Sequence, residues 1–383
     1  MIPEAEQFKS CINKHLCIDD WQALEIVLAA TIAHKLKGEM LWLRIIGASG
    51  SGKTEILRAI KDIPEGYTET LETMTPAAIR RGFRPIKLNK KTEQYEDIIK
   101  EPTLLERIDG KLVITKELAP LLTRNADARL EIFGLLRSCH DGELDADYGS
   151  TQGHITQKVW FDWILGTTAY VDSQNQLEMQ LGSRFTDVRW GSPIGVKDAI
   201  GKAIGNVDGL GTIRQELSAI VSSIVSHAKI EDALSFKVED WLLDLCQVVA
   251  VMRTPVERDG YTKEIRCKPS PELGTRIGQN FSKIARGLHM LGISDIRPHL
   301  TRLAWDALPP NRADILHSIL TLEFAGHKVT QEAIENNNGL GLSQSAISYI
   351  IKDLKVLDTK GLPWRDCLGF YYEKLLRIES SLL

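Results

Sequence analysis

The order of apolar and polar positions along this chain predicts a helical N-terminal region. From about Pro3 to Lys37 apolar residues recur at helical spacing, and Asp19 or Asp20 is suited to cap the second half of the stretch. Additional apolar residues widen the stripe, so this second helix should be mostly buried beside a larger core. The stripe is made of Trp21, Leu24, Leu28 and Ile32.

The middle of the chain alternates short apolar runs with helical stretches. Three runs have the length and composition of buried strands, and helical patterns lie between them. Two alternating runs on either side of the glycine turn 149–153 predict a β-hairpin before the third strand. A parallel sheet with flanking helices accounts for this order. The strand-like runs are 41–46, 112–115 and 161–166, and the helical stretches are 55–60 and 127–139.

The second half of the chain predicts helices that follow a glycine-rich segment. Residues 191–211 are rich in glycine and poor in large apolar side chains, which is typical of a linker. Helical patterns begin again beyond it, and the last three are typical of a winged-helix domain. The predicted helices cover 213–228, 238–252, 271–291, 312–322, 329–334 and 342–354.

The loop between the first strand and its helix carries the most specific chemical signal. Residues 47–54 fit the pattern G-x-x-x-x-G-K-[ST], whose glycines let backbone N–H groups turn toward phosphate oxygens. Lys53 would reach the β- and γ-phosphates of ATP, and the Thr54 hydroxyl would bind Mg²⁺. The N-terminus of the following helix adds its positive end at the same place. The rest of the loop is formed by Gly47, Ser49, Gly50, Ser51 and Gly52.

A second strand end, at Lys116 and Glu117, is a candidate for the hydrolytic half of such a site. In P-loop ATPases a buried strand ends in an acidic pair that holds Mg²⁺ and polarises the attacking water. Glu117 stands where the water-polarising acid belongs, whereas Lys116 stands where an aspartate is usual. The alternative is an ordinary strand that ends in a solvated Lys-Glu pair. After the third strand, Thr168 is suited to a polar contact with the γ-phosphate.

The order of these pieces resembles a known family. A P-loop, an acid-ending strand, a helix, a hairpin and a polar-ending strand follow one another, as in AAA+ ATPases that insert a hairpin before the sensor strand. The triplet Ser183-Arg184-Phe185 is similar to the arginine-finger box of minichromosome-maintenance helicases. The stretch from about Trp21 to Trp190 also resembles ATPases carried by phages and other mobile elements, often beside primases.

This resemblance implies a site shared between subunits. Arg184 would reach the nucleotide of a neighbouring subunit, which implies a homo-oligomer, of the hexameric-ring type. Arg276, near the start of a helix in the predicted lid, would be a second sensor arginine. Both arginines have a simpler alternative role as surface or helix-capping residues.

The resemblance also implies the fold class: an α/β P-loop AAA+ core, followed by a helical lid and a C-terminal winged-helix domain. Residues 1–40 would form an N-terminal helical collar and residues 41–191 the nucleotide-binding core. Residues 192–305 would form the linker and lid, and residues 306–383 the winged helix.

DNA contacts are expected at two places. His154 and Lys158 lie on the predicted hairpin, which would touch single-stranded DNA in a central channel. Small polar residues at the start of the third C-terminal helix suit the groove and phosphates of a duplex. Many winged helices bind protein instead, and this segment is not strongly basic, so that alternative stays open. The candidate residues of this helix are Ser343, Gln344, Ser345 and Lys352.

Composition narrows the class of protein. Of the 383 residues, 43% are hydrophobic and 26% charged, which is typical of a globular protein. The net charge is −4, so a nucleic-acid partner would need a local basic surface. Six scattered cysteines indicate reduced thiols rather than a disulfide framework or a zinc site. No apolar run approaches the ~20 residues of a membrane span, and the N-terminus does not resemble a signal peptide. We therefore expect a cytoplasmic protein with no membrane partner.

The sequence thus predicts an oligomeric ATP-dependent motor acting on DNA, a helicase-like translocase in the replication of a phage or mobile element. The alternative is an ATP-switched DNA-binding regulator or helicase loader without unwinding activity, which Lys116 favours. A third hypothesis, an ATPase that uses nucleotide only to assemble, is disfavoured because no effector or repeat segment is evident.

Overall fold

The computed structural model describes residues 1–64, 66–80, 86–89, 94–97, 102–148, 153–173, 184–191, 195–357 and 359–369. They separate into two compact units, one formed by residues 1–233 with 286–293 and the other by 234–285 with 294 onward. The boundary falls inside helix α12 (Thr275–Met290). The four-part division expected from the sequence stays a prediction.

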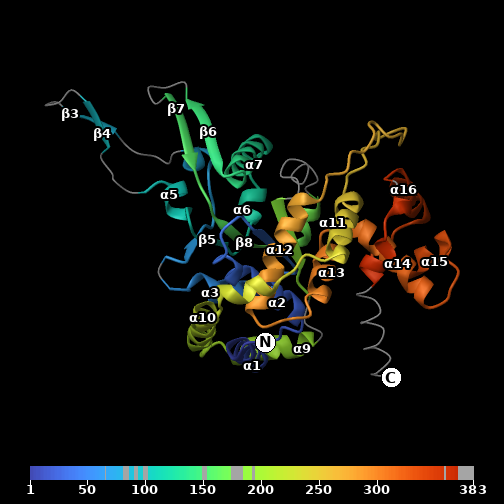
Figure 1. The fold of residues 1–383 in the computed structure, drawn as a ribbon, viewed down its shortest axis with the longest axis horizontal. Helices are drawn as coiled ribbons and strands as arrows, with labels where there is room; N and C mark the ends of the chain where they lie inside the picture. Colours follow the sequence, from blue (N-terminus) through green and yellow to red (C-terminus); the bar gives the residue numbers. More distant parts are fainter. Residues whose placement is uncertain are drawn as a thin grey trace. The chain divides into compact units, whose positions relative to one another are not determined.

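The first unit is built on one five-stranded sheet in which every neighbouring pair is parallel. In spatial order its strands are β2 (Thr68–Thr70), β5 (Leu112–Thr115), β8 (Asp162–Thr167), β1 (Trp42–Ile46) and β9 (Phe185–Arg189). Two of them, β5 and β8, are labelled in Figure 1. β1, β5 and β8 are buried at every residue, so the three apolar runs are confirmed as core strands.

Helices cover both faces of this sheet. On one face Trp42, Val113 and Trp163 belong to the main apolar core, which also takes in residues from four helices. On the other face α3 (Lys53–Lys61) contacts β2, β5 and β8. This layering is the α/β architecture with flanking helices that the sequence predicts. The four helices of the first face are α4 (Pro76–Arg80), α5 (Leu104–Ile108), α6 (Ala119–Leu122) and α7 (Ala126–His140).

The helical N-terminus is confirmed as two helices, α1 (Pro3–His15) and α2 (Trp21–Ala33). Asp20 caps α2, because its Oδ1 accepts a hydrogen bond from the backbone N–H of Ala23 at 3.1 Å. From Ala23 to Ala33 every residue of α2 except Glu25 is buried, as its apolar pattern predicts.

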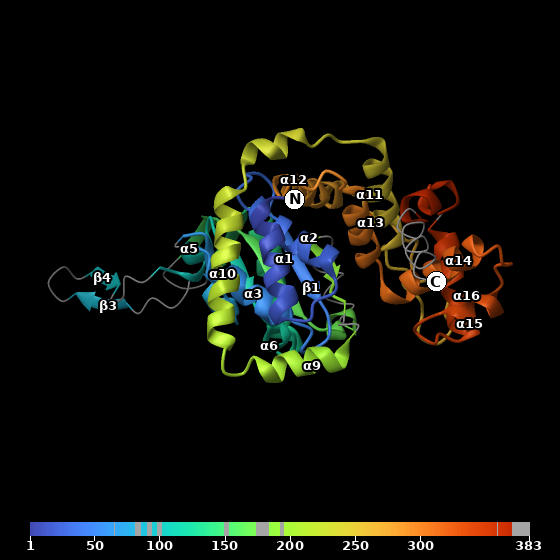
Figure 2. The ribbon, with the colours of Figure 1, turned by 90° about the horizontal axis from the view of Figure 1, so that it is seen from below.

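The predicted glycine-rich linker is wrong, since residues 191–211 hold a helix and the start of another. These are α9 (Val196–Gly205) and α10 (Leu210–His227), which passes beside α1 and α3 (Figure 2). Long side chains of this segment bind the end of α1: Lys202 Nζ donates to the carbonyl oxygen of Asn13 at 2.6 Å. The high glycine content favoured a linker, although the segment also has apolar residues at helical spacing. On α9 these apolar residues are exposed rather than buried.

The hairpin predicted before the third core strand is confirmed. β6 (Glu143–Tyr148) and β7 (Gly153–Lys158) pair antiparallel, and the four residues of their turn lie outside the described residues. A second antiparallel pair, β3 (Ile86–Asn89) with β4 (Gln94–Asp97), lies between α4 and α5 in the chain. Its strands were not expected from the sequence.

The second unit is helical in its described part. Three C-terminal helices occur where the sequence predicts them, and Thr330 caps the middle one by accepting from the N–H of Ala333 at 3.1 Å. Between the last of them and residue 369 the described chain forms a 3₁₀ turn and a short helix, with no strand pair that would form a wing. The helices are α11 (Asp240–Met252), α13 (Arg297–Asp306), α14 (Pro310–Phe324), α15 (Gln331–Asn337) and α16 (Gln344–Val356).

None of the described helices combines the length and the hydrophobicity that crossing a membrane requires.

Candidate nucleotide-binding site

The glycine loop lies at the carboxyl edge of the parallel sheet. β1 ends at Ile46, the loop follows, and Gly52 forms the N-cap of α3. The N–H of Gly47 donates to the carbonyl oxygen of Thr167 at 3.1 Å, so the loop starts beside the end of β8. Clefts at this edge of parallel sheets are where α/β proteins bind ligands.

The loop conformation requires its glycines. Gly50 and Gly52 have φ values of +80° and +88°, in the left-handed region that side chains disfavour. At Gly47 a Cβ atom would lie 2.9 Å from both the Cβ and the carbonyl oxygen of Trp190. The three glycines of the motif therefore have distinct physical roles: two permit the turn and one permits close packing beneath it.

Lys53 is buried, and its ammonium group is held by the loop. Nζ donates to the carbonyl oxygens of Gly47 at 2.7 Å and Ala48 at 2.6 Å, and lies 3.3 Å from Ser51 Oγ. Burial lowers the pKa of Lys53 from its usual value, and the nearby carboxylate of Glu117 acts in the opposite direction. The structure therefore brings Lys53 and Glu117 into one electrostatic environment.

The hydroxyl groups of the loop divide into two kinds. Ser51 is buried and its Oγ donates to the carbonyl oxygen of Ala48 at 2.8 Å, which stabilises the loop. Ser49 and Thr54 are exposed and accessible to a ligand. Thr54 also begins the first turn of α3, where backbone N–H groups favour an anion.

The two residues that directly follow β5 are a lysine held in an ion pair and one acid, rather than two acids. Lys116 Nζ lies 2.7 Å from Glu72 Oε1, and Glu72 lies just after β2, the neighbouring strand. Glu117 is half-buried and its Oε1 accepts from the N–H of Ala119 at 3.2 Å. Thr168 is half-buried directly after β8, the strand between β5 and the P-loop strand.

Arg184 lies beside the amino-terminal ends of the sheet strands, whereas the glycine loop of the same chain lies beside their carboxyl ends. It directly precedes β9, which runs parallel to β1 with Phe185 opposite Trp42, at the start of the P-loop strand. Its side chain is buried, and Nη2 lies 2.7 and 2.8 Å from the carboxylate oxygens of Asp141, which caps α7. The geometry separates Arg184 from the phosphate loop of the same subunit, and the trans role stays a prediction.

Arg276 is the second residue of α12 and is half-buried in the second unit. Its assignment as a sensor of nucleotide stays a prediction.

Several residues that support the loop were not expected from the sequence. Trp190 Nε1 donates to the carbonyl oxygen of Ser51 at 2.9 Å, and the backbone N–H of Trp190 donates to Ile46. Arg189, at the end of β9, makes a bidentate pair with Asp172 at 2.8 and 2.9 Å. These partners are far apart in sequence, so no local motif marks them.

The helix that carries Thr54 is also fixed from outside. Arg214 of α10 makes a bidentate pair with Glu55 at 2.7 and 2.8 Å, and this hydrogen bond holds the pKa of the Glu55 carboxyl below its usual value. The contact links α10 to the residue that directly follows Thr54.

The candidate DNA contacts on the hairpin are only partly described. Lys158 is exposed at the end of β7 and available to a phosphate. His154 lies in β7, and its side chain lies outside the described residues.

The candidate contacts on α16 lie at its first turns. Ser343 is the N-cap, Gln344 and Ser345 are exposed beside it, and Lys352 is exposed with its Nζ 5.3 Å from the ring centre of Tyr349. The next residue, Asp353, is paired with another cation, because Arg258 donates to its Oδ1 at 2.6 and 2.8 Å.

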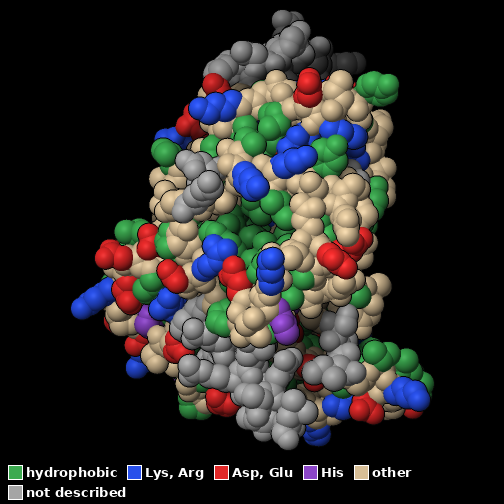
Figure 3. All heavy atoms as spheres, turned by 90° about the vertical axis from the view of Figure 1, so that its right-hand side faces the viewer, with side chains coloured by type: hydrophobic (Ala, Val, Ile, Leu, Met, Phe, Trp, Pro, Cys, Tyr) green, Lys and Arg blue, Asp and Glu red, His purple; other side chains and the backbone are tan. Residues whose placement is uncertain are grey.

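Charged side chains on the face drawn in Figure 3 are mixed in sign. Blue Lys and Arg side chains are interspersed with red, green and tan ones, and the described residues of this face form no continuous basic band. On this face, a nucleic-acid partner would therefore meet separate basic contacts rather than one extended stripe.

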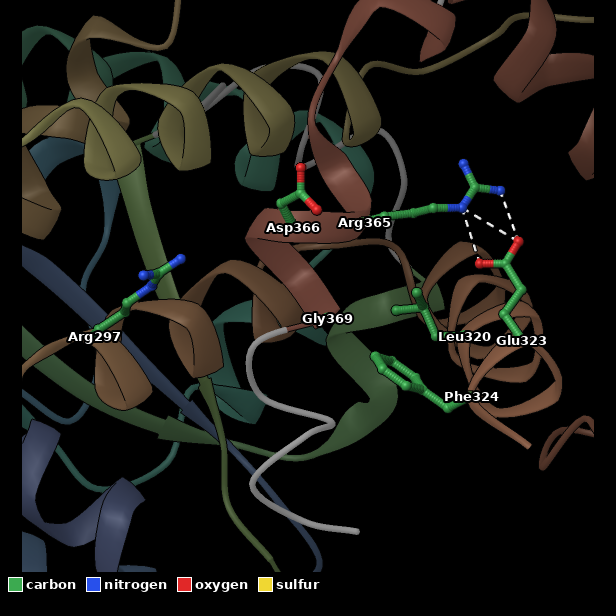
Figure 4. A pocket seen from close by; sticks show the side chains of 7 residues that line it. All are labelled: Arg297, Leu320, Glu323, Phe324, Arg365, Asp366 and Gly369. Carbon is green, nitrogen blue, oxygen red and sulfur yellow. Dashed lines mark hydrogen bonds and ion pairs between the residues drawn. The ribbon is translucent and has the colours of Figure 1, made fainter. Parts of the chain in front are cut away.

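The second unit contains a pocket of about 430 Å³ with none of this chemistry. As Figure 4 shows, Arg365 on its rim points toward Glu323, and three hydrogen bonds of 2.8 to 3.2 Å join them. Glu323 raises the pKa of Arg365 and satisfies its charge, so this rim is poorly suited to an anion. The glycine loop, and not this pocket, is the candidate nucleotide site.

Comparison with known proteins adds a likeness of fold only. No family model matches the chain, and no curated protein matches it. Among solved structures, the crystal structure of a presumed ATPase from Cytophaga hutchinsonii is 12% identical, with 80% of this chain and 86% of that chain covered and a TM-score of 0.41. This TM-score is too low to carry an argument. The interpretation of this protein as an ATPase therefore depends on the parallel sheet and its glycine loop.

Proposed function

We propose that this protein is an ATPase that binds ATP and Mg²⁺ at residues 47–54 and acts on DNA as an oligomeric AAA+ motor. The observation that carries the proposal is the buried Lys53, held inside a left-handed glycine turn between β1 and α3. Glu117 follows β5, two strands away from the P-loop strand, and its charge still acts on Lys53. A phosphate-binding loop beside a carboxylate is the combination that nucleotide hydrolysis requires.

The residues present fit a nucleoside triphosphate. Loop N–H groups and the N-terminus of α3 would bind phosphate oxygens, and Lys53 would exchange its carbonyl partners for the β- and γ-phosphates. ATP would supply the phosphoanhydride bond and Mg²⁺ would neutralise charge on its phosphates. Thr54 would hold the metal, with Glu117 oriented toward water and Thr168 toward the γ-phosphate. The fit for Mg²⁺ is the weaker part, because Lys116 replaces the usual aspartate.

The assignment to an AAA+ motor is supported by topology. The strand order, with β8 between the P-loop strand and the Glu117 strand, resembles the core of AAA+ ATPases, and the β6–β7 hairpin stands before β8 as in the resembling clade. The position of Arg184 at the far edge from its own loop suits a finger that acts on a neighbouring subunit. This fold-level analogy favours a ring of subunits.

The proposal also names the molecule on which the ATPase acts, which is DNA. Lys158 on the hairpin and the first turns of α16 are its contacts, the first for a single strand and the second for a duplex. We infer a helicase-like role in the replication of a phage or mobile element, carried out in the cytoplasm. Measurement of ATP turnover with and without single-stranded DNA tests it, and a turnover rate that DNA leaves unchanged would contradict it.

The second candidate function is an ATP-switched regulator or helicase loader that unwinds nothing. The Lys116–Glu72 ion pair favours it, because a cation at this position weakens metal binding and hydrolysis more than nucleotide binding. A strand-displacement assay separates the two functions. Unwinding that requires ATP supports the motor, whereas DNA-stimulated turnover without unwinding supports the regulator.

A further inference from the structure

Helices α1 and α10 pack side by side, and their interface contains a cluster of metal-ligating side chains. His227 Nδ1 lies 3.2 Å from Glu4 Oε1 at one end of the pair, and His15 faces Glu216 at the other, so the helices are antiparallel. Both views of the fold show the two helices adjacent to each other (Figures 1 and 2).

The cluster consists of Cys11, His15 and Glu216. Cys11 and His15 are four residues apart on α1 and therefore lie on the same helix face, one turn apart. Glu216 faces them from α10. The Cys11 Sγ, an imidazole nitrogen of His15 and a carboxylate oxygen of Glu216 lie within 4.8 Å of one another. A thiol, an imidazole and a carboxylate are the three donor types that zinc binds in proteins.

The imidazole of His15 supplies an independent indication of a ligand. Its Nε2 is buried and makes no hydrogen bond to any described residue, while the nearest carboxylate oxygen of Glu216 lies 3.7 Å away. A buried ring nitrogen without a partner is unusual, because its desolvation is not compensated. Meanwhile the His15 backbone carbonyl accepts from Asn206 Nδ2 at 2.6 Å, which fixes this end of α1.

We propose that Cys11 Sγ, His15 Nε2 and Glu216 bind one Zn²⁺ ion between α1 and α10, with water as the fourth ligand. Tetrahedral zinc with bond lengths of about 2.0–2.3 Å brings its ligand atoms to roughly 3.5 Å from one another. Small side-chain rotations of the three residues close the cluster from its present spacing to that distance. The soft thiolate selects zinc over Mg²⁺, which binds oxygen donors.

The ion would fasten the N-terminal helix to the nucleotide-binding core. α10 carries Arg214, which binds Glu55 in the first turn of the phosphate-loop helix. A metal on the same helix therefore stabilises the scaffold from which that contact is made. The role is structural, so it is separable from ATP binding and from DNA.

Cobalt titration of the full-length, chelator-treated protein tests the proposal, because Co²⁺ replaces Zn²⁺ and a thiolate ligand gives a charge-transfer absorption band. We expect one Co²⁺ per chain, displaced by Zn²⁺, and a band that Cys11→Ser abolishes. His15→Ala and Glu216→Gln should weaken Co²⁺ binding by at least the roughly tenfold that loss of an outer-shell partner causes.

Cys17→Ser is the matched control, since Cys17 lies two residues beyond His15 and outside the cluster. The control should retain the band and the increase in Tm on addition of Zn²⁺. Thermal melting without metal checks that each variant folds. A wild-type protein that binds no Co²⁺, or a band that survives Cys11→Ser, would overturn the proposal, whatever the ATPase activity.

Discussion

The two halves of the candidate nucleotide site differ in how completely the chain builds them. The glycine loop has two left-handed glycines and a buried lysine. It accepts a hydrogen bond from Trp190 and donates one to the carbonyl oxygen of Thr167. The end of β5 has one half-buried carboxylate and a lysine paired with Glu72. Binding of phosphate and its hydrolysis are therefore separate properties of this fold, and each can be changed without the other.

Electrostatics explains why the difference matters. An acid after β5 would attract Mg²⁺, whereas the Lys116 ammonium repels it over the short distances at a strand end. The Glu72 carboxylate neutralises much of that charge, so the net effect is the absence of one acid rather than the presence of one base. Four substitutions test this comparison: the first removes nucleotide binding, on which turnover depends, and the next three change turnover or its Mg²⁺ requirement by progressively smaller factors.

Lys53→Ala should remove ATP binding almost completely. The ammonium is the buried cation inside the loop, and its loss leaves the β- and γ-phosphates without their strongest partner. We expect affinity to fall by at least about 100-fold, equivalent to ~2.7 kcal/mol, measured by calorimetry. Lys61→Ala, on the last turn of the same helix, is the control and should bind ATP normally. Normal ATP binding by Lys53→Ala would show that the glycine loop is not the nucleotide-binding site.

Arg184→Ala should spare ATP binding and lower turnover in the assembled protein by roughly 10³-fold or more, the contribution of an arginine finger. Asp141→Asn separates this role from a structural one, because it breaks the same ion pair while keeping the arginine. If Tm and turnover decrease by the same amounts in both variants, the Arg184–Asp141 pair has a structural role only.

Mixing Arg184→Ala with Lys53→Ala subunits sharpens that test. A shared site predicts that turnover returns, since some interfaces then combine an intact loop with an intact arginine. Mixed subunits as inactive as either variant alone would contradict a finger that acts in trans.

Glu117→Gln should lower turnover by roughly 10²-fold or more, as loss of a general base does, with ATP affinity nearly unchanged. The amide keeps the shape of the side chain but cannot polarise water. Glu69→Gln, on the neighbouring strand β2, is the control. Single-turnover kinetics separates the chemical step from ATP binding. Hydrolysis at the wild-type rate would show that a residue other than Glu117 polarises the attacking water.

Lys116→Asp should have the smallest effect, and in the opposite direction. A second acid after β5 should reduce the Mg²⁺ concentration needed for half-maximal turnover by roughly three- to tenfold, equivalent to 0.7–1.4 kcal/mol. Lys116→Ala removes the pair with Glu72 without adding an acid, and isolates the effect of the new charge. An unchanged Mg²⁺ requirement in both variants would show that this position does not face the metal.

Local patterns predicted much of the fold and one half of the site. The glycine loop, the three core strands, the Asp20 cap and the hairpin all follow from residues close together in sequence. The error at residues 191–211 has a local cause as well, because glycine content outweighed the helical stripe of α9. Exposure of that stripe could not be predicted, since burial depends on what the rest of the chain covers.

Long-range partners account for what the sequence could not predict. Trp190 supports a loop 139 residues earlier, and Glu216 reaches the Cys11–His15 face from a helix about 200 residues away. Metal-ligand spacing is recognisable only when the ligands share one segment. Of the three proposed ligands, two share a helix and the third does not, so the spacing of the cysteines alone does not indicate such a site.

The indole beneath the phosphate loop also gives the molecule an intrinsic optical probe. Trp190 is hydrogen-bonded to the loop itself, whereas Trp42 and Trp163 meet edge to face in the apolar core. A ligand that draws the Lys53 ammonium away from its carbonyl partners alters the electric field at this one ring. The difference in fluorescence emission between the wild-type protein and Trp190→Phe therefore follows occupancy of the loop in real time, with no label attached.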